Sequence, residues 1–231
     1  MPDFLKKEID FDYSFPDAKA CLNELTTKEQ NELIAHKTDI EFEAGEIIVK
    51  RGLSVSHILY LIDGLVKLEF TNEGKPCTIG LIHSHSFIGI ICCFAFEKFD
   101  FTVTALEKTK VRFIDKNVFE NFIKTNPNFA LNLIKHMSGV SNGLLHRITN
   151  LSQKNIDGAL SIILLDFADL YKSDKFKLPM VRKELVNMLG YSKESVINTL
   201  SKFNKEGILK VSDRKIEILD KPKLIQISKI G

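Results

Sequence analysis

The residues with the clearest chemistry lie between positions 182 and 200. Leucines four residues apart in the first half, and Val196 and Leu200 in the second, predict two short helices with apolar faces. Gly190 between them suits a tight turn, and Ser192 suits the N-cap of the second helix. Two helices joined in this way form a helix-turn-helix, which places its second helix in the major groove of DNA. The pattern therefore predicts a DNA-binding site.

The second predicted helix carries the side chains that could read bases. Lys193, Glu194, Ile197 and Asn198 lie on the face opposite its apolar residues, at the N-terminal end that meets base edges in a recognition helix. A β-hairpin predicted over 208–218 would form a wing beside it. Basic residues near the tip of that wing are Lys210, Arg214 and Lys215.

The charge distribution agrees with a polyanionic partner for the C-terminal part. The formal net charge is only +2, but residues 1–150 hold 17 Lys or Arg against 20 Asp or Glu. Residues 151–231 hold 15 basic against 10 acidic side chains. The basic excess therefore lies on the part of the chain that contains the predicted helix-turn-helix.

Composition excludes several other classes of protein. A chain of 231 residues with 44 % hydrophobic residues and little net charge is not of the disordered type. The longest apolar run, residues 87–96, falls short of the ~18 residues that a membrane span needs. The first eight residues lack the pattern of a signal peptide, and the four cysteines contain no C-x-x-C pair. We expect a cytoplasmic protein with reduced thiols and no membrane association.

Two further patterns precede the helix-turn-helix. Residues 40–115 show about eight short β-rich runs, with Asp63-Gly64 predicting a hairpin, and this spacing favours a sandwich or roll. From 127 to 155, apolar residues recur at alternating steps of four and three, a heptad seam that favours a parallel homodimer. The seam residues expected at the dimer interface are Ile134, Met137, Ser141, Leu144, Ile148 and Leu151.

These elements predict an α+β protein in three parts. Residues 1–126 would form a double-stranded, jelly-roll-like β-roll that acts as a sensor domain. Residues 127–155 would form a long dimerisation helix, and residues 156–231 a winged helix-turn-helix domain.

In this order of elements the chain resembles the Crp/Fnr transcription regulators from about residue 22 to residue 227. The motifs Arg182-x-Glu184-Leu185 and Gly190-x-Ser192-x-Glu194-Ser195-Val196, with Leu200, match the helix-turn-helix signature of that family. Phe87-Ile88-Gly89 matches the start of its ligand-binding loop. The resemblance implies a homodimer on a two-fold operator in double-stranded DNA, and RNA polymerase as a further partner of a member that activates.

The resemblance also assigns roles to single residues. Arg182 would hold a phosphate, and Glu194 would accept a hydrogen bond from a cytosine amino group. Asn198 stands where members that read guanine carry Arg, and because Asn suits adenine we expect a shifted half-site. The expected DNA contacts are Arg182, Ser192, Lys193, Glu194, Ile197, Asn198, Lys202, Arg214 and Lys215.

The effector loop departs from the pattern of cyclic-nucleotide binders. Ile90 follows Gly89 where those members carry Glu, and Phe101 precedes Thr102 where they carry Arg. An apolar pocket cannot hold a phosphodiester charge without a heavy desolvation cost, so we expect a signal other than cyclic AMP. The expected pocket residues are Phe87, Gly89, Ile90, Ile91, Phe101, Thr102, Leu144 and Leu145.

Two other functions are alternatives. His83, His85 and Cys92-Cys93 beside an apolar pocket, with Met1-Pro2, are similar to features of a haem-sensing branch of the family. His83-Ser84-His85 is also similar to the H-x-H of cupin metalloenzymes, but the next acid is Glu97 and the acid ligand should follow more closely. The oxygen-sensing branch carries a cluster of N-terminal cysteines where this chain has only Cys21, which argues against an iron–sulfur cluster. We expect no enzyme activity, no metal ligands and no cofactor.

Overall fold

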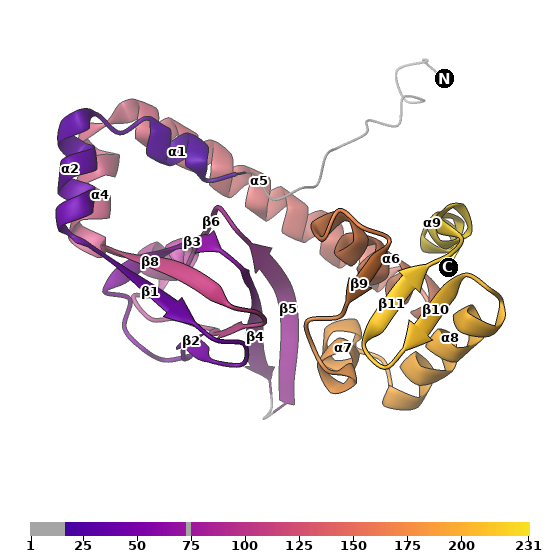
Figure 1. Ribbon diagram of the computed structural model, residues 1–231. Coiled ribbons are helices and arrows are strands. Elements are labelled where there is room, and N and C mark those ends of the chain that lie inside the picture. Colours follow the sequence, from indigo (N-terminus) through magenta and orange to yellow (C-terminus); the bar gives the residue numbers. More distant parts are fainter. Residues whose placement is uncertain (1–16, 73–74) are drawn as a thin grey trace, which may run out of the picture.

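The computed structural model describes residues 17–72 and 75–231. They form a β-roll, one long helix and a C-terminal unit of helices and short strands (Figure 1). Within these ranges, the helices are too short or too polar to cross a lipid bilayer.

The β-roll consists of two four-stranded antiparallel sheets that face each other across the first hydrophobic core. One sheet has the order β1 (Lys37–Phe42), β8 (Thr109–Asp115), β3 (His57–Asp63) and β6 (Ser86–Ile88). The other has the order β2 (Ile47–Val49), β7 (Thr102–Ala105), β4 (Leu65–Asn72) and β5 (Lys75–His83). Four short helices complete this part: α1 (Lys19–Asn23), α2 (Thr27–Ala35), α3 (Ile90–Ala95) and α4 (Lys116–Thr125).

The hairpin predicted at Asp63-Gly64 is wrong. β3 pairs with β6 and β8, whereas β4 pairs with β5 and β7, so the turn carries the chain from one sheet to the other. Gly64 adopts a φ of 101°, and a Cβ there would lie 2.7 Å from the Cα of Thr109. Glycine is therefore needed for a close crossing between sheets.

The long helix α5 (Pro127–Ser152) follows the roll and leads to the C-terminal unit (Figure 1). Asn126 caps it by accepting a hydrogen bond from the backbone N–H of Phe129, and Pro127 occupies its first turn. Phe129 and Leu133 are buried in the core of the roll, whereas Ile134 and Ile148 on the same helix are more than 60 % exposed. One face of α5 thus packs against the roll, and another face is exposed to solvent.

The C-terminal unit has its own hydrophobic core, centred on α6. Its elements are α6 (Ile156–Leu170), β9 (Lys175–Lys177), α7 (Arg182–Leu189), α8 (Lys193–Lys205), β10 (Leu209–Ser212), β11 (Lys215–Ile218) and α9 (Lys221–Ile230). The strands form a small antiparallel sheet of order β10-β11-β9. Together with the β-roll, this unit gives the α+β fold that the sequence predicts.

Candidate nucleic-acid interface

The helix-turn-helix forms where the sequence predicts it, between α7 and α8. Gly190 ends α7 in the left-handed region, with a φ of 72°, which glycine adopts without strain. The Ser192 hydroxyl caps α8 by accepting a hydrogen bond from the backbone N–H of Ser195 at 3.1 Å. Val196 and Leu200 are buried against the core of the unit. These contacts fix the direction in which α8 presents its other face.

The opposite face of α8 is open to solvent at its N-terminal end. Lys193, Glu194 and Asn198 are exposed, and Ile197 is half-buried beside them. An ammonium, a carboxylate and an amide thus lie together at one end of the helix, where they are exposed and not packed into the core. This set can contact phosphates and hydrogen-bond the donor and acceptor groups of bases.

The wing lies beside the start of α7. Arg182 donates from Nη2 to the backbone carbonyl of Asp213 at 3.1 Å, and the N–H of Leu178 donates to the carbonyl of Arg214 at 2.8 Å. Asp213 turns the hairpin in the left-handed region, with a φ of 51°. Arg182 is therefore held at the turn of the wing, which is followed in the chain by Arg214 and Lys215, two further expected DNA contacts.

Lys202 has a partner within the chain. Its Nζ lies 2.7 Å from Oδ2 of Asp157 in the first turn of α6, and the Thr199 hydroxyl donates to Oδ1 of the same carboxylate at 3.1 Å. The hydrogen bond from Lys202 to Asp157 raises the pKa of the lysine. The sequence predicts that Lys202 contacts DNA. It does not indicate the ion pair with Asp157, because the two residues are 45 positions apart.

Glu184, a residue of the family motif, has two roles in the structure that the motif alone does not indicate. Its Oε2 accepts a hydrogen bond from the backbone N–H of Val181 at 2.9 Å, so it satisfies a free donor at the start of α7. A glutamate at the third helical position is a capping signal that the sequence displays. Its other oxygen contacts Lys67 of the β-roll, which no local pattern indicates.

The expected dimer residues follow the open face of α5. Ile134 and Ile148 are 63 % and 65 % exposed, Ser141 is exposed, and Met137, Leu144 and Leu151 are half-buried. Leu131 and Leu145 on the same helix are also exposed, at 51 % and 63 %. A row of exposed apolar side chains along one helix is characteristic of a protein interface.

The expected effector residues do not all face one space. A Cβ on Gly89 would lie 2.6 Å from Cε1 of Phe99, whose ring lies 6.1 Å from that of Phe101. Ile91 and Leu145 instead face solvent, at 49 % and 63 % exposure. The remaining members are the buried Phe87 and Ile90, the half-buried Leu144, and Thr102, whose hydroxyl accepts from the N–H of Arg51. Sequence reasoning missed Phe99, although it lies only two residues before Phe101.

The residues around Gly89 do not fit a cyclic nucleotide. The ring of Phe99 covers the glycine, and the neighbouring Ile90 and Phe101 are buried hydrocarbon. The guanidinium of Arg51, whose backbone N–H donates to Thr102, pairs with Asp100 at 2.8 Å. A phosphodiester placed beside these hydrocarbon side chains would lose its hydration, and the Arg51 guanidinium already has Asp100 as its partner.

The two histidines considered for metal or haem chemistry have other contacts. Nδ1 of His85 lies 3.2 Å from the Tyr60 hydroxyl, and Nδ1 of His83 lies 3.0 Å from the carbonyl of Ser84. Across residues 17–72 and 75–231, His, Cys, Asp and Glu side chains do not gather in threes that could hold a metal ion. All four cysteines carry free thiols, of which Cys77 alone is exposed. Met1-Pro2 lies outside the described residues.

Comparison with protein families matches both units of the structure. Residues 39–126 match the cyclic nucleotide-binding domain, and residues 159–227 match the Crp-like helix-turn-helix domain. The first match covers most of the β-roll, and the second covers most of α6 through α9.

Transcription regulators from other bacteria are similar to this chain over most of its length. The transcriptional activator protein FnrA of Stutzerimonas stutzeri is 24 % identical over 181 residues, which is 76 % of this chain and 74 % of that protein. The fumarate and nitrate reduction regulatory protein of Yersinia pestis is 24 % identical over 213 residues, 90 % of this chain and 84 % of that protein. A solved CRP/FNR-family transcriptional regulator from Thermus thermophilus superposes with a TM-score of 0.70 at 21 % identity, covering 83 % of this chain and 98 % of that one.

Proposed function

The chain is a DNA-binding transcription regulator of the Crp/Fnr family, and from this premise we propose that it acts as a homodimer on a two-fold operator. The α5 helices of two copies would pair along their exposed apolar faces and present two copies of α8 to half-sites about one helical turn apart. In this arrangement Arg182 and the wing hold phosphates, Glu194 and Asn198 read bases, and RNA polymerase is the further partner if the protein activates.

The observation that carries the proposal is the open N-terminal end of α8. Lys193, Glu194 and Asn198 are exposed there, while Ser192 and Gly190 fix the helix in position. The apolar half of the same helix is buried, which leaves the polar face as the one available to DNA. The basic wing tip beside Arg182 adds contacts to phosphates, which strengthen binding without reading sequence.

The signal in the β-roll is proposed to be something other than cyclic AMP. The support is the aromatic cover over Gly89 and the pairing of Arg51 with Asp100. A signal that repacks the roll against α5 would shift the population of two dimer arrangements, and so move the reading helices.

The DNA test is selection from a random duplex pool by the purified full-length protein, followed by titration of the selected duplex at several salt concentrations. We expect a two-fold sequence and an affinity that falls steeply with salt, because phosphate contacts release counterions. Glu194→Gln should lose selectivity at one position of each half-site. The matched control is Glu206→Gln, an exposed glutamate at the other end of α8.

Selection of no duplex, or of a sequence without two-fold symmetry, would contradict the proposal. The cyclic AMP part is tested separately by titration calorimetry of the same protein. We expect no binding heat at micromolar concentrations of nucleotide, and a micromolar Kd would overturn that part alone.

A further inference from the structure

Lys67 connects the β-roll to the helix-turn-helix through a buried ion pair. Its side chain is only 8 % exposed, and its Nζ contacts Oε1 of Glu184 on α7. The same Nζ lies 3.0 Å from Oε1 of Glu69, two residues further along β4. Burial lowers the pKa of Lys67, but the hydrogen bonds to Glu184 and Glu69 raise it above its ordinary value, so the side chain stays charged.

The partner of Lys67 belongs to the DNA-binding motif. Glu184 uses Oε2 to cap the N–H of Val181 and Oε1 to bind Lys67, and it lies two residues after Arg182. The contact therefore acts on the first turn of α7, next to a side chain proposed to hold a phosphate.

The surroundings of this ion pair show which contacts α7 makes with the roll. α7 packs beside β5 (Figure 1). Leu65 and Leu106 of the roll are buried in the hydrophobic core of the C-terminal unit. An apolar contact tolerates sliding, whereas a buried ammonium needs its carboxylate in one place. If α7 turned away, Lys67 would lose one of its two carboxylate partners.

The strand that carries Lys67 has contacts on both of its faces. Val66 and Leu68 point into the core of the roll, and the ring of Phe70 lies 6.0 Å from that of Phe101. Leu65 and Lys67 point the other way, toward the C-terminal unit. A displacement of β4 would therefore act on α7 through Lys67.

We propose that Lys67 is a positioning residue for DNA recognition, which sets the orientation of the helix-turn-helix relative to α5 and hence the half-site spacing that the dimer reads. This inference rests on the proposed function. Lys67 does not contact DNA; it acts through Glu184.

The test compares full-length wild type with Lys67→Met, Lys67→Arg and Glu184→Gln. Lys110→Met is the matched control, because Lys110 also faces a glutamate, Glu41 at 3.9 Å, but within the roll. The first measurement is amide hydrogen exchange without DNA. We expect faster exchange in α7 and β5 for Lys67→Met, a smaller change for Glu184→Gln, and none for Lys67→Arg or the control.

The second measurement is affinity for the duplex selected by the wild type and for versions with one or two base pairs added between half-sites. Each added base pair turns one half-site by roughly a tenth of a helical turn, so the wild type should lose ~10-fold in affinity or more. Lys67→Met should bind the original duplex ~10-fold more weakly and distinguish the spacings by less than ~3-fold. Lys67→Arg should keep the wild-type preference.

A Lys67→Met protein with wild-type exchange and wild-type spacing preference overturns the inference. Faster exchange with an unchanged spacing preference also overturns it, since the contact would then be merely structural. If Lys67→Met does not fold, Glu184→Gln decides in the same way, because its amide can still accept from Val181. If the wild type selects no duplex, the proposed function is overturned. If the wild type selects DNA but binds duplexes of all spacings equally well, only this inference is overturned.

Discussion

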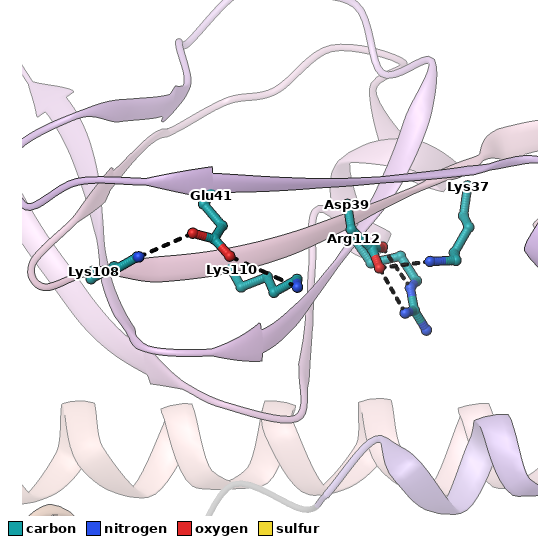
Figure 2. Close-up of polar contacts among 6 residues, drawn as sticks. All are labelled: Lys37, Asp39, Glu41, Lys108, Lys110 and Arg112. Carbon is teal, nitrogen blue, oxygen red and sulfur yellow. Dashed lines mark hydrogen bonds and ion pairs between the residues drawn. The ribbon is translucent and has the colours of Figure 1, made fainter.

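Arg112 donates two parallel hydrogen bonds to Asp39 across the β1–β8 pair, from Nε to Oδ1 at 2.8 Å and from Nη2 to Oδ2 at 3.0 Å (Figure 2). Lys37 adds a contact to Oδ2 at 2.6 Å. Further along β1, Glu41 pairs with Lys108 and Lys110. The hydrogen bonds from Arg112 hold the pKa of Asp39 well below its ordinary value. Burial acts in the opposite direction and raises this pKa, whereas the contact with Lys37 lowers it further. Charged pairs of this kind also protect β1, an edge strand, from pairing with other chains.

Replacement of Asp39 by Asn should lower the free energy of unfolding by about 1 to 2 kcal/mol at pH 7, because charge-assisted hydrogen bonds are lost. Folding depresses the pKa of this carboxyl, so its contribution to stability is fully present when the pH is above its ordinary pKa of 3.8. The contribution is lost as the pH falls toward the folded-state pKa. Urea denaturation at pH 7 and at pH 3 measures the difference. A gap between Asp39→Asn and wild type that is equally large at both pH values would contradict the assignment.

Replacement of Asn198 by Arg should move the preferred base at one position of each half-site from adenine to guanine. Arg forms paired hydrogen bonds with guanine, and such a pair is worth ~10-fold to ~100-fold in discrimination. Selection from a random duplex pool with wild type and variant reads this directly. Ser201→Arg adds the same charge to an exposed position further along α8, so an identical shift with both variants would show a charge effect rather than base reading.

Replacement of Ile148 by Glu should separate the proposed dimer. Burial of this side chain twice in a symmetric interface contributes about 3 kcal/mol, so its loss should raise the dimer Kd ~100-fold or more. Sedimentation equilibrium measures that constant. Asn150→Glu, an exposed position two residues along α5 and therefore on another face, should leave it unchanged, and equal dissociation of both variants would argue against this face as the interface.

Alkylation should distinguish one thiol from the other three. Burial raises the pKa of Cys21 to about 11 and also raises the pKa of Cys92 and Cys93, so few of these groups are thiolate at pH 8. Cys77 is exposed. Treatment of the native protein with iodoacetamide, followed by mass spectrometry, should find Cys77 modified first, and equal modification of Cys92 would contradict the buried placement of α3.

The sequence predicts those parts of the structure that depend on neighbouring residues. The helix-turn-helix is correct because the Gly190 turn, the Ser192 cap and the spacing of Val196 and Leu200 all act within one segment. The Asp63-Gly64 turn is wrong because strand pairing depends on how the two sheets close, and a local turn signal does not report the partner.

Parts of the candidate site escape prediction for a similar reason. Lys202 resembles any exposed basic residue of a recognition helix until Asp157 is placed beside it. Lys67 lies on the outward face of a strand, where alternation predicts exposure. It is buried against α7, whose Glu184 lies 117 residues further along the chain. The ring of Phe99 covers Gly89 because α3 folds the chain back, although the apolar run at 87–96 alone indicates neither a helix nor a strand.

The placement of Leu65 and Leu106 in the core of the C-terminal unit has a consequence for how the chain folds. A fragment of residues 156–231 would leave part of its own apolar surface without a cover, and a fragment that ends before α6 would expose two leucines that are almost fully shielded here. The β-roll and the C-terminal unit thus share part of one hydrophobic core. Because separate domains commonly melt in separate transitions, a single transition in scanning calorimetry of the full-length protein is the expected sign of this shared core, and two transitions would contradict it.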